Sequence, residues 1–200
     1  MTASLWMLSA ILGLRHAFEP DHMAAVATLI SGTHRPTTAA RLGASWGIGH
    51  GAALLAMATL LALAQATLRP SSAAALEVLV GVMLIALGAA RLAAALRASA
   101  APAADHPTGR SFSIGIIHGL AGSGALAVLA ASQVPSTAGR LAFVATFGVG
   151  SIVGMSLLSG FAGGLLERLS RHPGVTKGQG LLAGGLSLIV GVSWLLTHTR

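Results

Sequence analysis

Six long apolar runs, divided by short polar gaps, leave this chain few folds to adopt. The runs cover residues 5–30, 42–68, 74–96, 111–131, 141–163 and 179–197. Each is close to the ~20 residues that a helix needs to cross a bilayer. Only 8% of the 200 residues are charged, whereas an ordinary soluble domain has about 25%. We therefore expect an all-α integral membrane protein with six transmembrane helices.

The two halves of the sequence resemble each other at three places in the same order. The aligned segments are Gly13–His16 with Gly115–His118, Gly47–His50 with Gly148–Ser151, and Gly81–Ile85 with Gly185–Ile189. Because three crossings per half is an odd number, the second half must run through the membrane upside down, an arrangement typical of transporters. We expect three-helix repeats at 1–97 and 111–200, joined by a cytoplasmic linker at 98–110.

The basic residues predict how these spans are oriented. Eight lie in or beside the gaps that follow the first, third and fifth spans, and three lie on the other side. The eight are Arg35, Arg41, Arg91, Arg97, Arg110, Arg168, Arg171 and Lys177, and the three are Arg69, Arg140 and Arg200. Basic residues favour the cytoplasmic side. We expect a multi-pass protein of the cell (inner) membrane with both termini outside.

Composition also excludes several function classes. There is no cysteine, so disulfides and thiolate metal sites are excluded. The net charge of +7 does not indicate nucleic-acid binding, because the basic residues occupy short gaps with few aromatic neighbours. No Walker motif is present, so the chain itself is not expected to hydrolyse ATP.

Ionisable residues are concentrated in one segment, Arg15–His22, inside the first apolar run. Charge at such a depth is costly and usually functional. His16, Asp21 and His22 supply two imidazoles and a carboxylate, a ligand set for a borderline divalent metal. Arg15 and Glu19 are four residues apart, which favours an ion pair that neutralises both charges.

Pro20 lies between these ligands and predicts a break in the first helix. It cannot donate a hydrogen bond to the carbonyl of His16. We expect that carbonyl to be free and the helix to be kinked. Such a distortion is tolerated in a membrane only where it faces protein or a wet cavity.

Two further histidines, His50 and His118, reach a similar depth from other spans. His22 and His50 each lie nine residues from the first cytoplasmic gap, roughly 13 Å inside the membrane at ~1.5 Å per residue. His118 follows Arg110 by eight residues. His16 is expected about two turns further out, which indicates a short path rather than one closed cage. Either His50 or His118 alone would equally fit a packed, hydrogen-bonded role.

The segment His16-x4-Asp21-His22, preceded by Arg15, resembles the signature of the nickel/cobalt transporter family. Gly49-His50-Gly51 resembles the second motif of that family. The resemblance implies that His16, Asp21, His22 and His50 form the metal site. Together with Ile117–Gly124 in the fourth span, the pattern is more similar to the six-span urease accessory membrane proteins, which implies a supply of nickel for urease.

We therefore expect a permease for Ni²⁺ or Co²⁺ that supplies a metalloenzyme such as urease, and not an enzyme. The ion would bind transiently as cargo, with no prosthetic group. Expected partners are the divalent ion, the lipid bilayer and a cytoplasmic metallochaperone, with no nucleic acid. One alternative is a non-transporting accessory protein in metalloenzyme assembly. A more remote one is an intramembrane serine protease using Ser123 and His50, whose serine would need a base within hydrogen-bond reach.

Overall fold

A computed structural model describes residues 3–33, 35–64, 70–97, 108–120, 134–169 and 175–198. Across these ranges the chain forms seven α-helices and no strand, which confirms the expected all-α class. The helices are α1 (Ala3–His16), α2 (Pro20–Ile30), α3 (Pro36–Leu63), α4 (Pro70–Arg97), α5 (Thr108–Leu120), α7 (Thr137–Leu169) and α8 (Val175–His198).

Four of these helices are long and apolar enough to cross a membrane. They are Pro36–Leu63, Ser71–Arg97, Thr137–Leu169 and Val175–His198, and each overlaps one expected span. The expected span 5–30 is instead the pair of short helices α1 and α2. The expected span 111–131 begins within α5, and its residues 121–131 lie outside the described part of the chain.

The predicted linker 98–110 also falls mostly outside the described residues. Residues 98–107 are not described, and Thr108–Arg110 already belong to the first turn of α5. Large apolar side chains are exposed on the outer helix faces, for example Leu63, Phe161 and Leu182 at 78%, 76% and 76%. Apolar surface of that extent is typical of a protein that contacts lipid.

The first apolar run is broken at the expected place. α1 ends at His16, Ala17–Glu19 form a turn, and Pro20 is the first residue of α2. Proline suits a helix start because its missing N–H would have no partner there. The expectation of a free carbonyl at His16 was wrong, because the backbone N–H of Glu19 donates to it at 3.1 Å.

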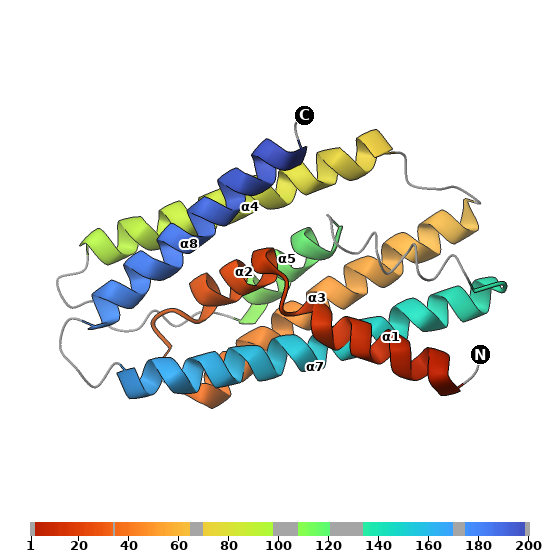
Figure 1. Cartoon of the computed structure of the whole chain (residues 1–200), viewed down its shortest axis with the longest axis horizontal. Coiled ribbons are helices and arrows are strands. Elements are labelled where there is room, and N and C mark those ends of the chain that lie inside the picture. The colour runs from red at the N-terminus through yellow and green to blue at the C-terminus, as the bar shows by residue number, and fades with distance from the viewer. Residues whose placement is uncertain are drawn as a thin grey trace.

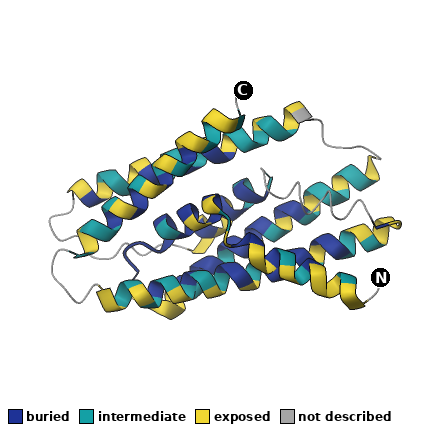
Figure 2. Ribbon diagram, viewed as in Figure 1, coloured by how far each residue is buried: buried dark blue, intermediate teal, exposed yellow. Residues whose placement is uncertain are grey.

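The helices form a two-part arrangement with α2 between the parts (Figure 1). In one part α3 packs along α7, while α1 lies against α7 and α5 lies against α3. In the other part α4 pairs with α8. The starts of α3 and α8 and the ends of α4 and α7 lie at one end of the molecule, and α1 begins at the other (Figure 1). Buried residues concentrate where α1, α2, α3 and α7 face one another (Figure 2).

Glycines allow the short helices to approach the long ones closely. A Cβ atom on Gly13 of α1 would overlap the carbonyl of Phe147 in α7. A Cβ atom on Gly115 of α5 would likewise overlap the carbonyl of Trp46 in α3. Small residues at such crossings are the usual basis of helix association in lipid.

Serine hydrogen bonds at these two crossings are equivalent as well. The Ser9 hydroxyl donates to the carbonyl of Phe143 at 2.6 Å, and the Ser111 hydroxyl donates to that of Leu42 at 3.0 Å. Gly13 and Gly115 are the residues that the comparison of the two sequence halves aligned. α1 therefore contacts α7 through the same kind of pairs as α5 contacts α3.

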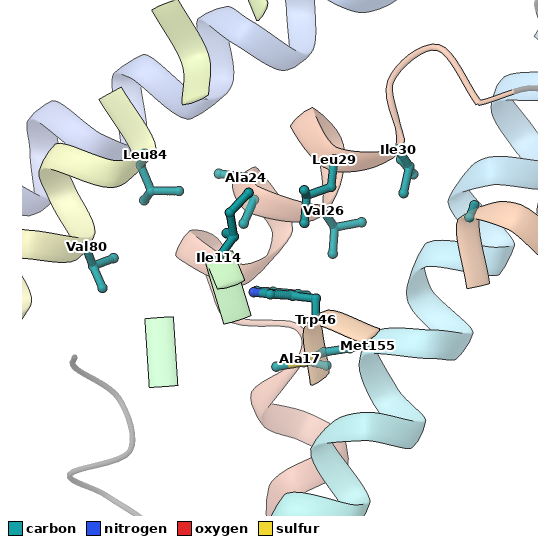
Figure 3. Packing of buried hydrophobic residues seen from close by; sticks show 12 residues of the cluster. Ala17, Ala24, Val26, Leu29, Ile30, Trp46, Val80, Leu84, Ile114 and Met155 are labelled. Carbon is teal, nitrogen blue, oxygen red and sulfur yellow. The ribbon is translucent and has the colours of Figure 1, made fainter. Parts of the chain in front are cut away.

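A buried apolar cluster joins the two parts around α2. It includes Val26 and Leu29 of α2, Leu84 of α4, Ile114 of α5 and Trp46 of α3. Figure 3 displays these side chains together with Ala17 and Met155. Packing on several sides fixes the position of α2, whose first turn carries Asp21 and His22.

Candidate metal centre

The five predicted ligands come from four helices and lie together in the interior. His16 ends α1, Asp21 and His22 lie in the first turn of α2, His50 lies in α3, and His118 lies near the end of α5. Their exposed fractions are 3% for His16, 1% for Asp21 and 0% for the other three. A buried set of ionisable residues is costly in a membrane protein unless its members interact.

Two groups of three ligands share His22. One group is His16, His22 and His50, and the other is Asp21, His22 and His118. Within each group, one ligand atom from every residue lies within 4.8 Å of the others. The ring centre of His22 is 4.2 Å from that of His16 and 4.3 Å from that of His118, so His22 contacts both sides of the cluster.

The expectation that His16 lies apart from the other ligands was wrong. Its Nε2 atom is 3.2 Å from Nε2 of His50. The depth estimate assumed one continuous helix, in which His16 and His22 would be separated along the axis. The turn at Ala17–Glu19 ends that helix, and this lets the last residue of α1 and the first turn of α2 converge.

The two facing nitrogens are spaced as ligands of one ion would be. Imidazole nitrogens bind transition metals at about 2.0–2.1 Å, so two of them on one ion lie roughly 3 Å apart. Gly119 helps to complete the cluster, because a Cβ atom there would overlap the carbonyl of His50. The close approach of α5 to α3 at this glycine brings His118 beside the other ligands.

Asp21 bridges two of the rings and thereby determines which nitrogens remain for a metal. Its Oδ1 atom is 3.0 Å from Nδ1 of His22, and its Oδ2 atom is 2.8 Å from Nε2 of His118. An ionised carboxylate only accepts hydrogen bonds, so each ring donates an N–H to it. Nε2 of His22 and Nδ1 of His118 are then lone-pair nitrogens, and both are buried without a hydrogen-bond partner. This is how a carboxylate orients histidine ligands in metal sites.

Glu19 has a similar relation to His16. Its Oε1 atom is 3.0 Å from Nδ1 of His16, which leaves Nε2 of that ring to face His50. The carboxylate of Glu19 is thus beside the cluster, and the expected pairing of Glu19 with Arg15 stays a prediction. Nδ1 of His50 is buried and has no hydrogen-bond partner.

Two aromatic rings lie against the cluster, and neither was predicted from the sequence to belong to the site. The Trp46 ring centre is 5.3 Å from that of His22 and 5.5 Å from that of His118. The Phe147 ring centre is 5.1 Å from that of His16. Trp46 is not an interfacial anchor. It is completely buried, and its position one turn before His50 was the signal that it shares the same helix face.

The serine of the protease alternative, Ser123, lies in a part of the chain that the structure does not describe. His50, its suggested partner, contacts the His16 ring. The fold and the cluster define a class of protein: an all-helical membrane protein with a buried site of four imidazoles and one carboxylate.

Comparison with known proteins shows what the chain is similar to. Residues 2–98 match the model of the NicO family, described as the high-affinity nickel-transport protein. The urease accessory protein UreH of Bacillus sp. (strain TB-90) is 28% identical over 206 residues, covering 96% of this chain and 90% of that protein. The chain is thus similar to the nickel-transport family over residues 2–98 and to a urease accessory protein over most of its length, in agreement with the resemblance of its H-x4-D-H segment.

Two longer plant proteins are also similar. The chloroplast proteins FOR GROWTH AND FERTILITY 2 and 1 of Arabidopsis thaliana are 30% and 28% identical, over 87% and 94% of this chain. The chain spans 52% and 60% of their lengths. No solved structure gives a significant match. The family match contains four of the five clustered ligands, and His118 lies beyond it.

Proposed function

We propose that the chain is a permease for divalent transition-metal ions, Ni²⁺ or Co²⁺, which it passes through the histidine–aspartate cluster. The observation that carries this proposal is the pair of buried three-ligand groups that share His22. Imidazole suits nickel and cobalt, and this ligand type does not separate the two metals. The match to a nickel-transport family model supports the same cargo.

The shared ligand suggests how an ion would move. An ion held by His16, His22 and His50 can exchange the first and third ligands for Asp21 and His118 while it keeps His22. This second step requires that the hydrogen bonds between Asp21 and the two rings be released first. Stepwise ligand exchange avoids a bare ion in a medium of low dielectric, which would be very costly. The ion would be bound transiently as cargo, and the chain would need no prosthetic group and perform no enzymatic reaction.

The cluster also links transport to protons. A metal binds only deprotonated imidazole, so an arriving ion displaces any proton held by the ligands. Histidine is the side chain that changes charge near neutral pH. The permease would therefore be sensitive to the proton concentration on the side from which it loads.

We propose further that the chain crosses the membrane six times as two inverted halves, 1–97 and 111–200. The equivalent crossings of α1 on α7 and of α5 on α3, with matched serine hydrogen bonds, support this arrangement. The distribution of basic residues supports a cell (inner) membrane location with both termini outside and the 98–110 linker inside. A cytoplasmic metallochaperone would receive the ion, and no nucleic acid would take part.

Topology can be tested directly because the chain has no cysteine. Single variants Gly109→Cys and Ser136→Cys would be labelled in intact cells with a membrane-impermeant maleimide. Both positions are exposed at helix starts. We expect Ser136→Cys to react from outside and Gly109→Cys to react only after the cells are opened. Labelling of both from outside would contradict the inverted arrangement.

Transport is tested with purified protein in sealed vesicles. The assay measures uptake of Ni²⁺, Co²⁺, Zn²⁺ and Mg²⁺ with and without a pH gradient. We expect uptake of Ni²⁺ or Co²⁺ and its loss in His22→Ala. Glu77→Gln is the matched control, since Glu77 accepts a hydrogen bond from Trp194 in the α4 and α8 pair. Nickel and cobalt uptake by His22→Ala at the rate of the unmodified chain would refute the proposal.

A second candidate function follows from the name of one relative, the urease accessory protein. A protein of that kind could assist assembly of a nickel enzyme, urease included, without moving ions itself. The vesicle assay separates the two functions, because only a permease produces metal flux with no other protein present.

A further inference from the structure

A pair of arginines forms a basic site that is separate from the metal cluster. It lies at the end of the molecule where α2 and α4 end and α5 begins. A cavity of about 180 Å³ opens there between the three helices. Arg91 of α4 and Arg110 of α5 both line it, and no acidic residue is among the described residues around it. The volume is far above the roughly 10–15 Å³ that one water needs, so the cavity admits a polyatomic anion.

The guanidinium group of Arg91 has a donor that no protein group among the described residues accepts from. Its Nε atom is buried and has no hydrogen-bond partner. A guanidinium group offers five N–H donors in a planar fork that matches phosphate geometry. Arg91 lies six residues before the end of α4, roughly 9 Å along the helix at ~1.5 Å per residue. A helix of 28 residues is roughly 42 Å long, so one centred on a hydrocarbon core of about 30 Å extends about 6 Å beyond it at each end. Arg91 would then lie near the boundary between the headgroups and the hydrocarbon region.

The other residues that line the cavity are apolar except Thr28, whose hydroxyl donates to the carbonyl of Ala25. The cavity opens toward the outside of the bundle. Leu29 and Leu87 line it, together with Ala90 and Ala94, which are one turn apart on α4. Both alanines are exposed. A site with two arginines above a groove of small exposed apolar residues matches an amphiphile, which has a charged head and a hydrocarbon chain. Basic pockets between transmembrane helices bind anionic lipids in this way.

We propose that this cavity binds the phosphate group of an anionic membrane lipid, with an acyl chain lying along Ala90 and Ala94. The proposal does not depend on metal transport. Leu29 lies on the same helix as Asp21 and His22, so the bound lipid would hold the far end of the helix that carries two ligands. An anionic lipid and a free phosphate ion would both present a phosphate group to the two arginines. The experiment must therefore distinguish between these two ligands.

The test measures thermal unfolding of the purified full chain in detergent with three separate additions. These are dioleoylphosphatidylglycerol, dioleoylphosphatidylcholine and inorganic phosphate. A ligand that binds the folded state raises the unfolding temperature in a concentration-dependent way. We expect a rise with the anionic lipid only, and an apparent affinity about tenfold lower in Arg91→Gln and in Arg110→Gln, since each removes charge-assisted hydrogen bonds.

Arg41→Gln is the matched control, because Arg41 is an exposed arginine at the same end of the molecule that does not line the cavity. If Arg91→Gln fails to fold, Ala94→Leu fills the groove without removing charge and is expected to weaken lipid binding as well. An equal loss in Arg41→Gln, an equal rise with phosphatidylcholine, or full binding by Ala94→Leu would overturn the proposal. A rise with inorganic phosphate alone would show a free ion as the ligand and overturn the lipid assignment.

Discussion

Replacement of Asp21 by asparagine tests whether the carboxylate orients the histidine ligands. The two side chains have nearly the same shape, so the packing around α2 is kept. The carboxylate accepts hydrogen bonds from His22 at 3.0 Å and from His118 at 2.8 Å. An amide offers one acceptor oxygen and one donor nitrogen. One of the two rings would therefore face a donor and would have to change tautomer, which places a proton on the nitrogen that should bind the metal.

The expected magnitude follows from the loss of one oriented ligand. Removal of a group that orients a metal ligand typically lowers affinity by 10–100-fold. This corresponds to about 1.4–2.7 kcal/mol of binding free energy. Asp21→Asn should thus raise the Kd for Ni²⁺ by one to two orders of magnitude, while the helical content stays unchanged.

Trp46 provides the assay, because its ring is 5.3 Å from His22 and 5.5 Å from His118. The chain has three tryptophans, so a Trp6→Phe, Trp194→Phe background leaves Trp46 as the only fluorophore of its kind. Bound Ni²⁺ is expected to quench it, and titration gives the Kd. Glu77→Gln in the same background serves as the control carboxylate. A Kd for Asp21→Asn within about twofold of the background value would refute the orienting role.

Three further predictions concern packing and protonation. Gly13→Ala should lower the free energy of unfolding by about 1–3 kcal/mol, because the added Cβ atom would overlap the carbonyl of Phe147. Gly185→Ala, with no atom within 4 Å, should leave the unfolding temperature in detergent unchanged, and equal effects would contradict this packing. Ser9→Ala and Ser111→Ala should each lower the free energy of unfolding by about 0.6 kcal/mol, because each removes one interhelical hydrogen bond. A large difference between the two variants would argue against equivalent crossings. Metal uptake should fall when the loading side is acidified far enough to protonate the ligands, because protonated imidazole cannot bind an ion, and an uptake rate that rises on acidification would contradict histidine ligands.

The sequence predicted the parts of the structure that depend on local chemistry. The break at Pro20 follows from the missing N–H of proline, and the long helices follow from apolar runs of sufficient length. The separation assigned to His16 was wrong because it was measured along one straight helix. The sequence does not give the angle at which the chain leaves the turn before Pro20, and that angle determines how far His16 lies from His50.

Contacts between distant segments were the least predictable. The bridge from Asp21 to His118 depends on where α5 crosses α3, which is determined by packing at Gly115 and Gly119. The comparison of the two sequence halves singled out Gly115, but it did not indicate which helix Gly115 or Gly119 would contact. The burial of Trp46 beside the ligands depends on the same crossing.

The crossing of α5 on α3 also has a consequence for how the protein is made. A chain is synthesised from its N-terminus, so His16, Asp21, His22 and His50 enter the membrane before His118 exists. α1 packs against α7, which emerges later still. The ligand set is therefore incomplete while the first half is being inserted, and a nascent chain lacks the finished cluster with which to capture a metal ion.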